Sequence, residues 1–454
     1  MPRITLAVLA ALATTIIVTT KAENPLTCLT SVDANVDYFP DKVKPTDAKL
    51  FDIEYGLTFK IVSNLAVNET YLLYQCGSEP PEEQLDGRHA HVLKIPLSGV
   101  AVTQTPVITY LEQLGLVEEI AVFLTSPDLI SSPCFKARVD ADEVFILADV
   151  SDTDFTGGTG SAQASDAVAF VSPFDQNLPF EKQIVISAVS EGPSEAIFEW
   201  VKFYSAFFNK EAMANVVVET ANSRYDCIAG NAALIRTDSP DKPVVLWAYY
   251  LDFTGCQGWD VAKCPDRYYC DYADACAAEI ISTELGSIEC PGSAYMTTEE
   301  FVELGKDADY WIYPGSNWDE TLANNTELLS QMKSVQNQEV YDILGLGQNA
   351  WFEQRLAEYY DVLDDFCTIV GTTTIFNRER SFLRNVFTEE ANSVEEQCID
   401  PTASLILNDK HDCVPSVLTA PPVDGATPPA DASGATTISV LVGVFTLAVA
   451  TLFF

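Results

Sequence analysis

The sequence predicts an α/β protein of two lobes with mainly parallel sheets, joined by one long connecting helix, with a cleft between the lobes. Three observations predict this fold: a strand, loop, helix and strand over 100–124, an uninterrupted helical pattern over 193–225, and a second α/β series over 244–370. A strand followed by a helix and another strand is the βαβ unit of a parallel sheet. A helix over 193–225 would be about 50 Å long at ~1.5 Å per residue. That length exceeds one small domain and indicates a connection between two.

The first lobe is expected over 23–190, with extra strands at its N-terminal end. Residues 52–75 alternate apolar and polar side chains, which predicts a two-stranded opening. Val100–Val102 has the pattern of a short buried strand, and Pro106 begins the next helix because proline is favoured in the first helical turn. The elements expected in this lobe are a helix over 106–114 and strands over 91–95, 119–124, 167–171 and 184–188.

The connecting helix is expected over 191–226, where Ala196, Trp200, Phe203, Phe207 and Phe208 form an apolar stripe near helical period. The second lobe is expected over 227–415 and is rich in cysteine. Its helix over 297–304 is predicted from Thr297 or Thr298 as the N-cap. Its other elements are strands over 244–250, 310–313 and 340–341 and helices over 268–284, 325–333 and 351–370.

Both ends of the chain carry targeting patterns. Residues 1–22 have a positive start, an apolar run and a small-residue exit, which predicts a signal peptide. Residues 416–437 form a Pro/Ala/Thr-rich spacer before the apolar stretch 438–454, which no Lys or Arg follows. This combination is typical of a glycolipid (GPI) anchor signal, and a single-pass tail is the alternative. We therefore expect a secreted protein held on the extracellular face of the plasma membrane.

Composition supports this compartment and excludes nucleic acid as a partner. The chain has 66 Asp and Glu against 25 Lys and Arg, a net charge of −41, whereas nucleic acid requires a basic surface. The acidic excess is either a solvated coat or an attraction for cations. Twelve cysteines predict disulfides, although a zinc knot is the alternative for the five between Cys256 and Cys290. The sequons at Asn68 and Asn324 predict a glycoprotein.

Several segments, in order over about 90–372, resemble a known family. They begin with Val100-Ala-Val-Thr-Gln-Thr-Pro, and the others are 110–115, 198–203, 207–212, 296–301, 307–312, 332–335, 340–341 and 360–365. This set is similar to the periplasmic-binding-protein-like family of the siderophore/haem/cobalamin-binding class, the helical-backbone solute-binding proteins, in its eukaryotic cell-surface version. The resemblance implies capture of a small-molecule metal chelate between two α/β lobes, for uptake through a partner that the sequence does not identify.

Candidate ligand-binding residues lie in the loops that follow strands. In open α/β sheets, ligands bind beyond the carboxyl ends of the strands. Aromatic walls with a few polar groups suit a bulky chelate, and the Arg355 guanidinium matches an anionic one. The alternative is that each Trp is a core residue and Arg355 a charge on a helix surface. The candidates are Thr103, Gln104, Thr105, Ser172, Asp252, Phe253, Trp259, Asn317, Trp318, Trp351 and Arg355.

Other functions have weaker support. GxSxG, HExxH and P-loop motifs are absent from the sequence, so we expect no enzyme, no catalytic residues and no resident cofactor. The three histidines, His89, His91 and His411, are too few and too scattered for a His-type metal site. A ferric ion held by carboxylates and the tyrosine pairs at 249–250, 268–269 and 359–360 remains an alternative, although neighbouring residues of a strand point to opposite faces. The other alternative is a structural or adhesion protein of the cell surface with a filled cleft.

Overall fold

The computed structural model describes residues 23–147, 167–174, 178, 180–237, 241–253, 256–290, 293–373, 379–391, 397–408 and 413–414. The expected signal peptide, spacer and anchor signal lie outside these ranges, as does His411. Within them, no helix combines the length and the apolar character needed to cross a membrane.

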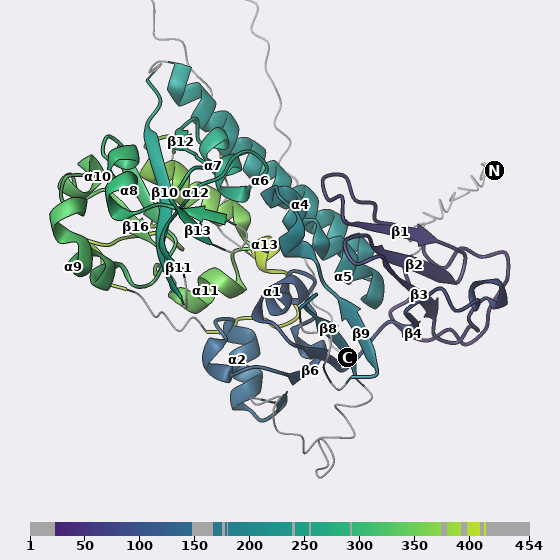
Figure 1. Cartoon of the computed structure of the whole chain (residues 1–454). Coiled ribbons are helices and arrows are strands. Elements are labelled where there is room, and N and C mark those ends of the chain that lie inside the picture. The colour runs from purple at the N-terminus through teal and green to yellow at the C-terminus, as the bar shows by residue number, and fades with distance from the viewer. Residues whose placement is uncertain are drawn as a thin grey trace, which may run out of the picture. The chain divides into compact units, whose positions relative to one another are not determined.

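A separate sheet forms the N-terminal end of the fold (Figure 1). Three strands make an antiparallel meander where two were expected, and the fourth runs parallel to the third. The sheet packs on a helix through Phe51, whose ring centroid lies 5.2 Å from that of Trp200. The strands are β1 (Phe51–Tyr55), β2 (Phe59–Asn64), β3 (Glu69–Gln75) and β4 (His91–Ile95).

The first lobe contains a five-stranded sheet in which all neighbouring strands are parallel, in the order β7-β6-β5-β8-β9. The βαβ unit is present as predicted, and Pro106 occupies the first turn of its helix. The strands are β5 (Val100–Val102), β6 (Ile120–Phe123), β7 (Phe145–Ile146), β8 (Val168–Val171) and β9 (Lys182–Val185), and the helices are α1 (Thr105–Gln113) and α2 (Pro133–Asp140).

The prediction of one continuous helix over 191–226 is wrong. Three helices occupy this region: α4 (Ser194–Phe198), α5 (Trp200–Phe208) and α6 (Glu211–Thr237). The main break is at Asn209, whose φ of 57° is left-handed. Its side chain donates to Gln75 Oε1 at 2.7 Å and accepts from Lys60 Nζ at 2.7 Å, both in the N-terminal sheet. These buried polar contacts hold Asn209 in a conformation that asparagine tolerates and that interrupts a helix.

Helix α6 makes the connection between the lobes (Figure 1). Its first half, with Ala214, Val217 and Ala221, belongs to the core of the first lobe. Its second half, with Ile228 and Ala232, belongs to a core of the second lobe. One long helix therefore joins two α/β lobes, and it lies further along the chain than the sequence predicted.

The second lobe contains a six-stranded mixed sheet in the order β11-β10-β15-β16-β17, with β12 also beside β10. β10, β12, β15 and β16 are parallel, and β11 and β17 are antiparallel edge strands. The mainly parallel two-lobed α/β fold is thus confirmed. The strands are β10 (Val244–Phe253), β11 (Cys256–Val261), β12 (Glu279–Ile281), β15 (Tyr310–Tyr313), β16 (Val340–Asp342) and β17 (Arg384–Asn385), with a separate hairpin of β13 (Ile288–Cys290) and β14 (Ser293–Tyr295).

The helices of the second lobe differ from expectation in three places. The helix expected over 268–284 ends at Ala275 and is followed by β12, the one expected over 325–333 begins earlier, and the one expected over 351–370 is divided. The cap at Thr297 is present as a full capping box with Glu300. The helices are α7 (Tyr268–Ala275), α8 (Thr298–Gly305), α9 (Trp318–Leu329), α10 (Lys333–Gln336), α11 (Gln348–Glu353), α12 (Tyr359–Ile369) and α13 (Leu405–Asn408).

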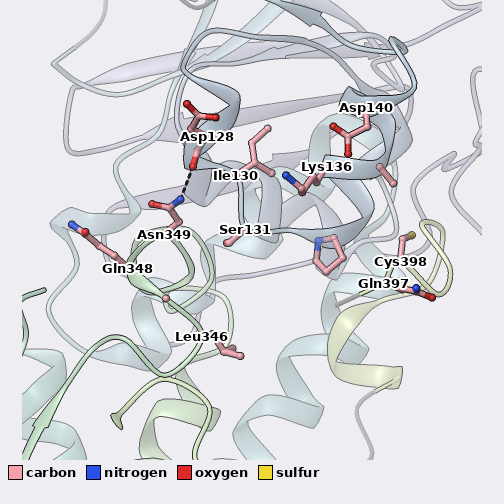
Figure 2. Close-up of a pocket in the computed structure, with 13 residues that line it drawn as sticks. Asp128, Ile130, Ser131, Lys136, Asp140, Leu346, Gln348, Asn349, Gln397 and Cys398 are labelled. Carbon is pink, nitrogen blue, oxygen red and sulfur yellow. Dashed lines mark hydrogen bonds between the residues drawn. The ribbon is translucent and has the colours of Figure 1, made fainter. Parts of the chain in front are cut away.

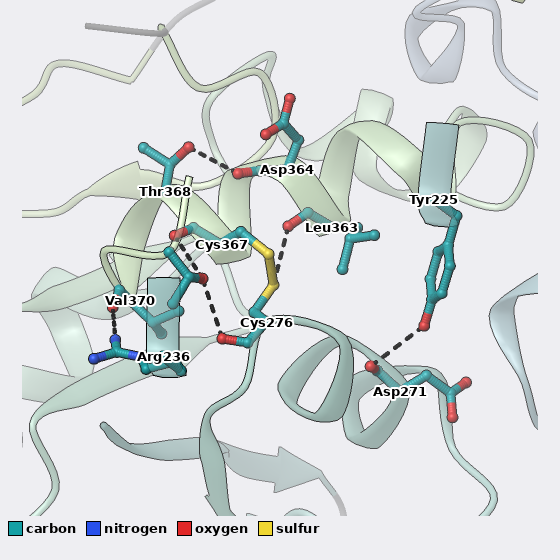
Figure 3. The surroundings of a disulfide bond; sticks show 10 residues. Tyr225, Arg236, Asp271, Cys276, Leu363, Asp364, Cys367, Thr368 and Val370 are labelled. Atoms are coloured by element: carbon teal, nitrogen blue, oxygen red, sulfur yellow. Dashed lines mark hydrogen bonds between the residues drawn. A yellow bond between two sulfur atoms is a disulfide. The ribbon is translucent and has the colours of Figure 1, made fainter. Parts of the chain in front are cut away.

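Disulfides fasten the ends of these elements, as predicted. Cys276–Cys367 joins the end of α7 to α12 (Figure 3). Thr372 Oγ1 donates to the carbonyl oxygen of Cys276 at 3.1 Å. Two further bonds fix residues 397–408 and 413–414, here called the strap, to α2 and α6. Cys256 is also oxidised, and no described cysteine is free. The disulfides of the described part of the chain include Cys28–Cys76, Cys134–Cys398, Cys227–Cys413, Cys264–Cys270 and Cys276–Cys367.

Candidate functional site

The short helix α11 contributes residues to two hollows. The first, here called the interlobe hollow, has a volume of about 770 Å³ and lies between α2 of the first lobe and the turn before α11 in the second. Figure 2 shows Asp128, Lys136 and Asp140 of the first lobe on one side and Gln348 and Asn349 on the other. Asn349 Nδ2 donates to the carbonyl oxygen of Asp128 at 2.6 Å and so joins the two walls. The strap closes one end with Gln397 and Cys398.

The second, here called the aromatic hollow, has a volume of about 370 Å³ within the second lobe. It lies where the parallel pairing of β10 with β15 ends, at Trp247 and next to Pro314, and ligands bind at the carboxyl ends of parallel strands in open α/β sheets. Six of its lining side chains are aromatic, and Arg355 supplies a positive charge. The lining residues are Trp247, Tyr249, Asp260, Val261, Ala262, Tyr268, Tyr269, Pro314, Trp351, Phe352 and Arg355.

Arg355 is held by aromatic faces and not by a carboxylate. Its guanidinium carbon lies 4.4 Å from the ring centroid of Tyr268 and 4.9 Å from that of Trp351. Its Nε is buried and has no hydrogen-bond partner, and no ion pair of Arg355 is found among the described residues. Cation–π contacts orient the guanidinium but leave its N–H groups without acceptors. The hollow is therefore suited to an anionic group that offers two oxygens.

Tyr249 and Tyr268 of the aromatic hollow are neutral donors at neutral pH. Burial, with the nearby Asp260 carboxylate, raises the pKa of Tyr249 to about 12. Burial also raises the pKa of Tyr268, although Arg355 opposes this shift. Asp260 forms an ion pair with Lys263 and also lines a neighbouring hollow of about 800 Å³, which shares Tyr269 with the aromatic hollow.

Of the predicted ligand residues, Trp351 and Arg355 both line the aromatic hollow. The first-lobe candidates line neither named hollow. Thr103 donates to the carbonyl oxygen of Phe170 at 3.1 Å, and Ser172 Oγ accepts from the Phe174 N–H at 3.0 Å. Gln104 is the N-cap residue of α1 and Thr105 is its first residue. These side chains mainly organise the loops at the carboxyl ends of β5 and β8.

The remaining candidates of the second lobe are core or loop-end residues. Trp259 is completely buried and stacks on Phe301 at 4.0 Å, and Trp318 is buried against Trp311, as the alternative interpretation of the tryptophans states. Trp259 does not line the aromatic hollow, although its neighbours Asp260 and Val261 on β11 do. Phe253 ends β10, Asp252 accepts from Gln257 Nε2 at 2.5 Å, and Asn317 accepts from the Tyr313 hydroxyl at 2.7 Å.

Sequence reasoning missed the other aromatic residues of the hollow. Trp247 and Tyr249 are two residues apart on β10 and share a face, which is the signal that identifies them. Tyr250, the other member of its pair, packs on Trp259 at 5.3 Å on the opposite face, as strand geometry predicts. Lys136 and Asn349 of the interlobe hollow belong to no sequence motif, because only the approach of two distant segments brings them together.

His89 and His91 are half-buried, and the two sequon asparagines are exposed. His91 Nε2 accepts from the Gln183 N–H at 3.1 Å, and His89 contacts Thr70 at 2.9 Å. Among the described residues no group of three or more His, Cys, Asp or Glu side chains is placed to hold a metal ion. Asn68, in the turn between β2 and β3, and Asn324, on α9, are both exposed.

Comparisons with known proteins add the following. No family model matches the chain. An uncharacterised lipoprotein of Methanocaldococcus jannaschii is 28% identical over 189 residues, which is 40% of this chain and 41% of that protein. The chain thus spans about two fifths of the length of the curated relative that it matches.

Similar solved structures include several periplasmic binding proteins. A haem-binding protein from Pseudomonas aeruginosa is 13% identical, with a TM-score of 0.43, over 60% of this chain and 93% of that one. FhuD2 from Staphylococcus aureus with bound ferrioxamine B is 12% identical, with a TM-score of 0.42, over 60% and 99%. HutB of Vibrio cholerae, a haem-binding protein, is 12% identical, with a TM-score of 0.40, over 59% and 98%.

Proposed function

We propose that the protein is a cell-surface solute-binding receptor that captures an anionic iron chelate, a siderophore or a haem-like ligand, for uptake. The observation that carries this proposal is Arg355, a guanidinium fixed between two aromatic rings without a described carboxylate partner. In this account Arg355 binds the anionic group of the chelate, and the ring faces of Trp351, Tyr268 and Phe352 contact its apolar body. The protein acts by binding and not by catalysis.

The size and chemistry of the aromatic hollow support this assignment. Its volume of about 370 Å³ lies within the usual range of ligand pockets, ~300–1,000 Å³. Phe352 lines the hollow and is 52% exposed, so a bound ligand would cover apolar surface of its ring. The solved structures of similar fold include haem and ferrioxamine B binders, which suggests ligands to test.

The proposed location rests on the oxidised cysteines, since disulfides persist in secreted proteins and not in the cytosol. The exposure of Asn68 and Asn324 is compatible with glycosylation at both. We propose attachment to the outer face of the plasma membrane through a C-terminal lipid anchor, with a single span as the alternative. Release of the protein from intact cells by a phosphatidylinositol-specific phospholipase tests the lipid anchor, and retention contradicts it.

Titration calorimetry with haem, a ferric hydroxamate and a ferric catecholate tests the function. We expect one of these to bind the wild type, and Arg355→Ala to weaken its binding about 10- to 100-fold, the value of a charge-assisted hydrogen bond. Arg88→Ala is the matched control, because Arg88 is an exposed arginine outside both named hollows. If no chelate binds, or if both variants bind as the wild type does, the proposal is wrong.

Two observations favour other functions. Helix α1 contacts α11 directly, because Thr109 Oγ1 donates to the Glu353 carbonyl oxygen at 3.1 Å. Part of the cleft is therefore filled, as a structural or adhesion protein would have it.

The aromatic hollow also contains oxygen ligands that suit a bare ferric ion, namely those of Tyr249, Tyr268, Tyr269 and Asp260. A visible charge-transfer band on adding ferric citrate, lost in Tyr249→Phe, would favour the ferric site over chelate capture.

A further inference from the structure

Two glutamates meet at the contact between the lobes. Glu112 is on α1 of the first lobe and is 5% exposed, and Glu353 ends α11 of the second lobe and is fully buried. Ser132, the N-cap residue of α2, joins them: its hydroxyl donates to Glu112, and its N–H donates to Glu353 at 2.8 Å. The Ser131 N–H donates to the other oxygen of Glu353 at 2.7 Å. One lobe therefore supplies the donors for a carboxyl group of the other.

No cation accompanies this pair among the described residues. The two arginines on neighbouring segments, Arg138 and Arg355, make their described contacts with other residues. Arg138 of α2 pairs with Glu143, and Arg355 faces Tyr268 and Trp351. The other charged side chains on these elements are one cation, Lys136, which makes no described ion pair with either glutamate, and the acids Asp128, Asp140, Glu358 and Asp400.

Two buried carboxyl groups this close and without a cation cannot both ionise at low cost, because burial and like charge each disfavour the second negative charge. We propose that the Glu112 and Glu353 carboxyl groups, joined through Ser132, hold at least one proton between them as a pair and form a pH-sensitive latch, which holds the first lobe to α11 while the proton is bound and weakens when both groups ionise. Two further hydrogen bonds lie in the same lobe contact and break when it opens. Gln354 Nε2 donates to Ser131 Oγ at 3.1 Å, and Gln113 Nε2 donates to the Ala357 carbonyl oxygen at 2.8 Å.

The direction of the pH effect follows from burial. Burial raises the pKa of Glu112 to about 7 and, together with the Glu112 charge, raises the pKa of Glu353 to about 8, from ordinary values of 4.5. Between about pH 4.5 and 8 the folded protein holds protons that the unfolded chain has lost, so stability falls as the pH rises through this window. The latch is thus firm in mildly acidic solution and loose above pH 8.

The latch would also regulate the proposed ligand site, and this part of the inference rests on the proposed function. Glu353 lies between Trp351 and Arg355 in the sequence, and both of these line the aromatic hollow. When the lobe contact opens, the segment from Trp351 to Arg355, which forms part of the wall of the aromatic hollow, loses its contacts with the first lobe. A chelate bound to Arg355 is then expected to dissociate faster at alkaline than at mildly acidic pH.

The latch is tested without any ligand. The melting temperature of the purified protein is measured from pH 5 to 9, with hydrogen exchange of the backbone amides of 128–132 and 348–354. We expect the wild type to lose about 3–6 °C between pH 5 and 8 beyond any loss in Glu353→Gln or Glu112→Gln, whose amides cannot ionise. We also expect exchange in these two segments to increase with pH, beyond its intrinsic increase, in the wild type only. Glu118→Gln, at an exposed glutamate beyond α1, is the matched control and should follow the wild type.

Superimposed pH profiles of the wild type and both glutamine variants would overturn the latch. If a variant fails to fold, the wild-type exchange profile decides alone, because exchange in these segments that only follows the intrinsic rate contradicts the proposal. If no chelate binds but the pH profiles of the wild type and the glutamine variants still differ, the proposed function is wrong and the latch stands.

Discussion

Glu353 and Arg355 are two residues apart and have opposite environments. Glu353 is an acid without a described cation, fully buried in the contact between the lobes and held by two backbone N–H groups. Arg355 is a cation without a described acid, between two aromatic rings on the wall of a hollow. Burial of an unneutralised charge is costly, so each arrangement needs a compensating partner. We propose that a bound proton neutralises Glu353 and that the anionic group of an external ligand neutralises Arg355.

The comparison predicts that loss of Glu353 mainly affects stability. In Glu353→Ala, the N–H groups of Ser131 and Ser132 lose their acceptor and a cavity forms at the lobe contact. We expect the free energy of unfolding to fall by about 2–4 kcal/mol at pH 6, measured by denaturant titration. Glu353→Gln keeps an acceptor oxygen and should lose less. Equal losses in the two variants would mean that the acceptor oxygens do not matter.

Loss of Arg355 should have the opposite profile. Arg355→Ala removes a guanidinium that makes no described ion pair, so its cost is limited to packing against Trp351 and Tyr268, about 1 kcal/mol. The same variant should lose most of its chelate affinity in the titration described above. A large loss of stability with unchanged ligand affinity would mean that Arg355 is a structural residue, and would contradict its proposed role in ligand binding.

A second acidic pair, Glu195 of α4 and Asp271 of α7, should make a smaller contribution to the pH dependence of stability than the Glu112–Glu353 pair. Burial raises the pKa of Glu195 to about 7 and that of Asp271 to about 6. Both shifts are upward, so this pair also lowers stability as the pH rises from about 4 to 7. Because the two groups are only partly buried, solvent screens them, and Glu195→Gln should flatten the melting-temperature profile less than Glu353→Gln does. A larger effect at Glu195 would place the main pH response outside the lobe contact.

Sequence patterns predicted the elements that depend on local signals. Pro106 and Thr297 mark helix starts that are present, and the buried strands at 100–102 and 310–313 form where expected. The break at Asn209 was not predictable, because Lys60 and Gln75, far away in the sequence, hold its side chain. Tertiary contacts here override a helical pattern that is locally strong.

The candidate site was less predictable than the fold. Trp259, Trp318 and Trp351 were all expected in loops that follow strands, and the sequence does not show which of them borders a hollow. That distinction depends on which strand face meets the core. Glu353 carries no sequence signal, since its role requires α2 of the other lobe to supply Ser131 and Ser132.

The most direct test of the central claim is anomalous diffraction at the iron edge, from crystals of the protein grown with the chelate that binds. We predict one iron peak in the aromatic hollow, with an anionic oxygen of the chelate bound to the Arg355 guanidinium. An iron peak in the interlobe hollow, or a chelate that does not contact Arg355, would contradict the account.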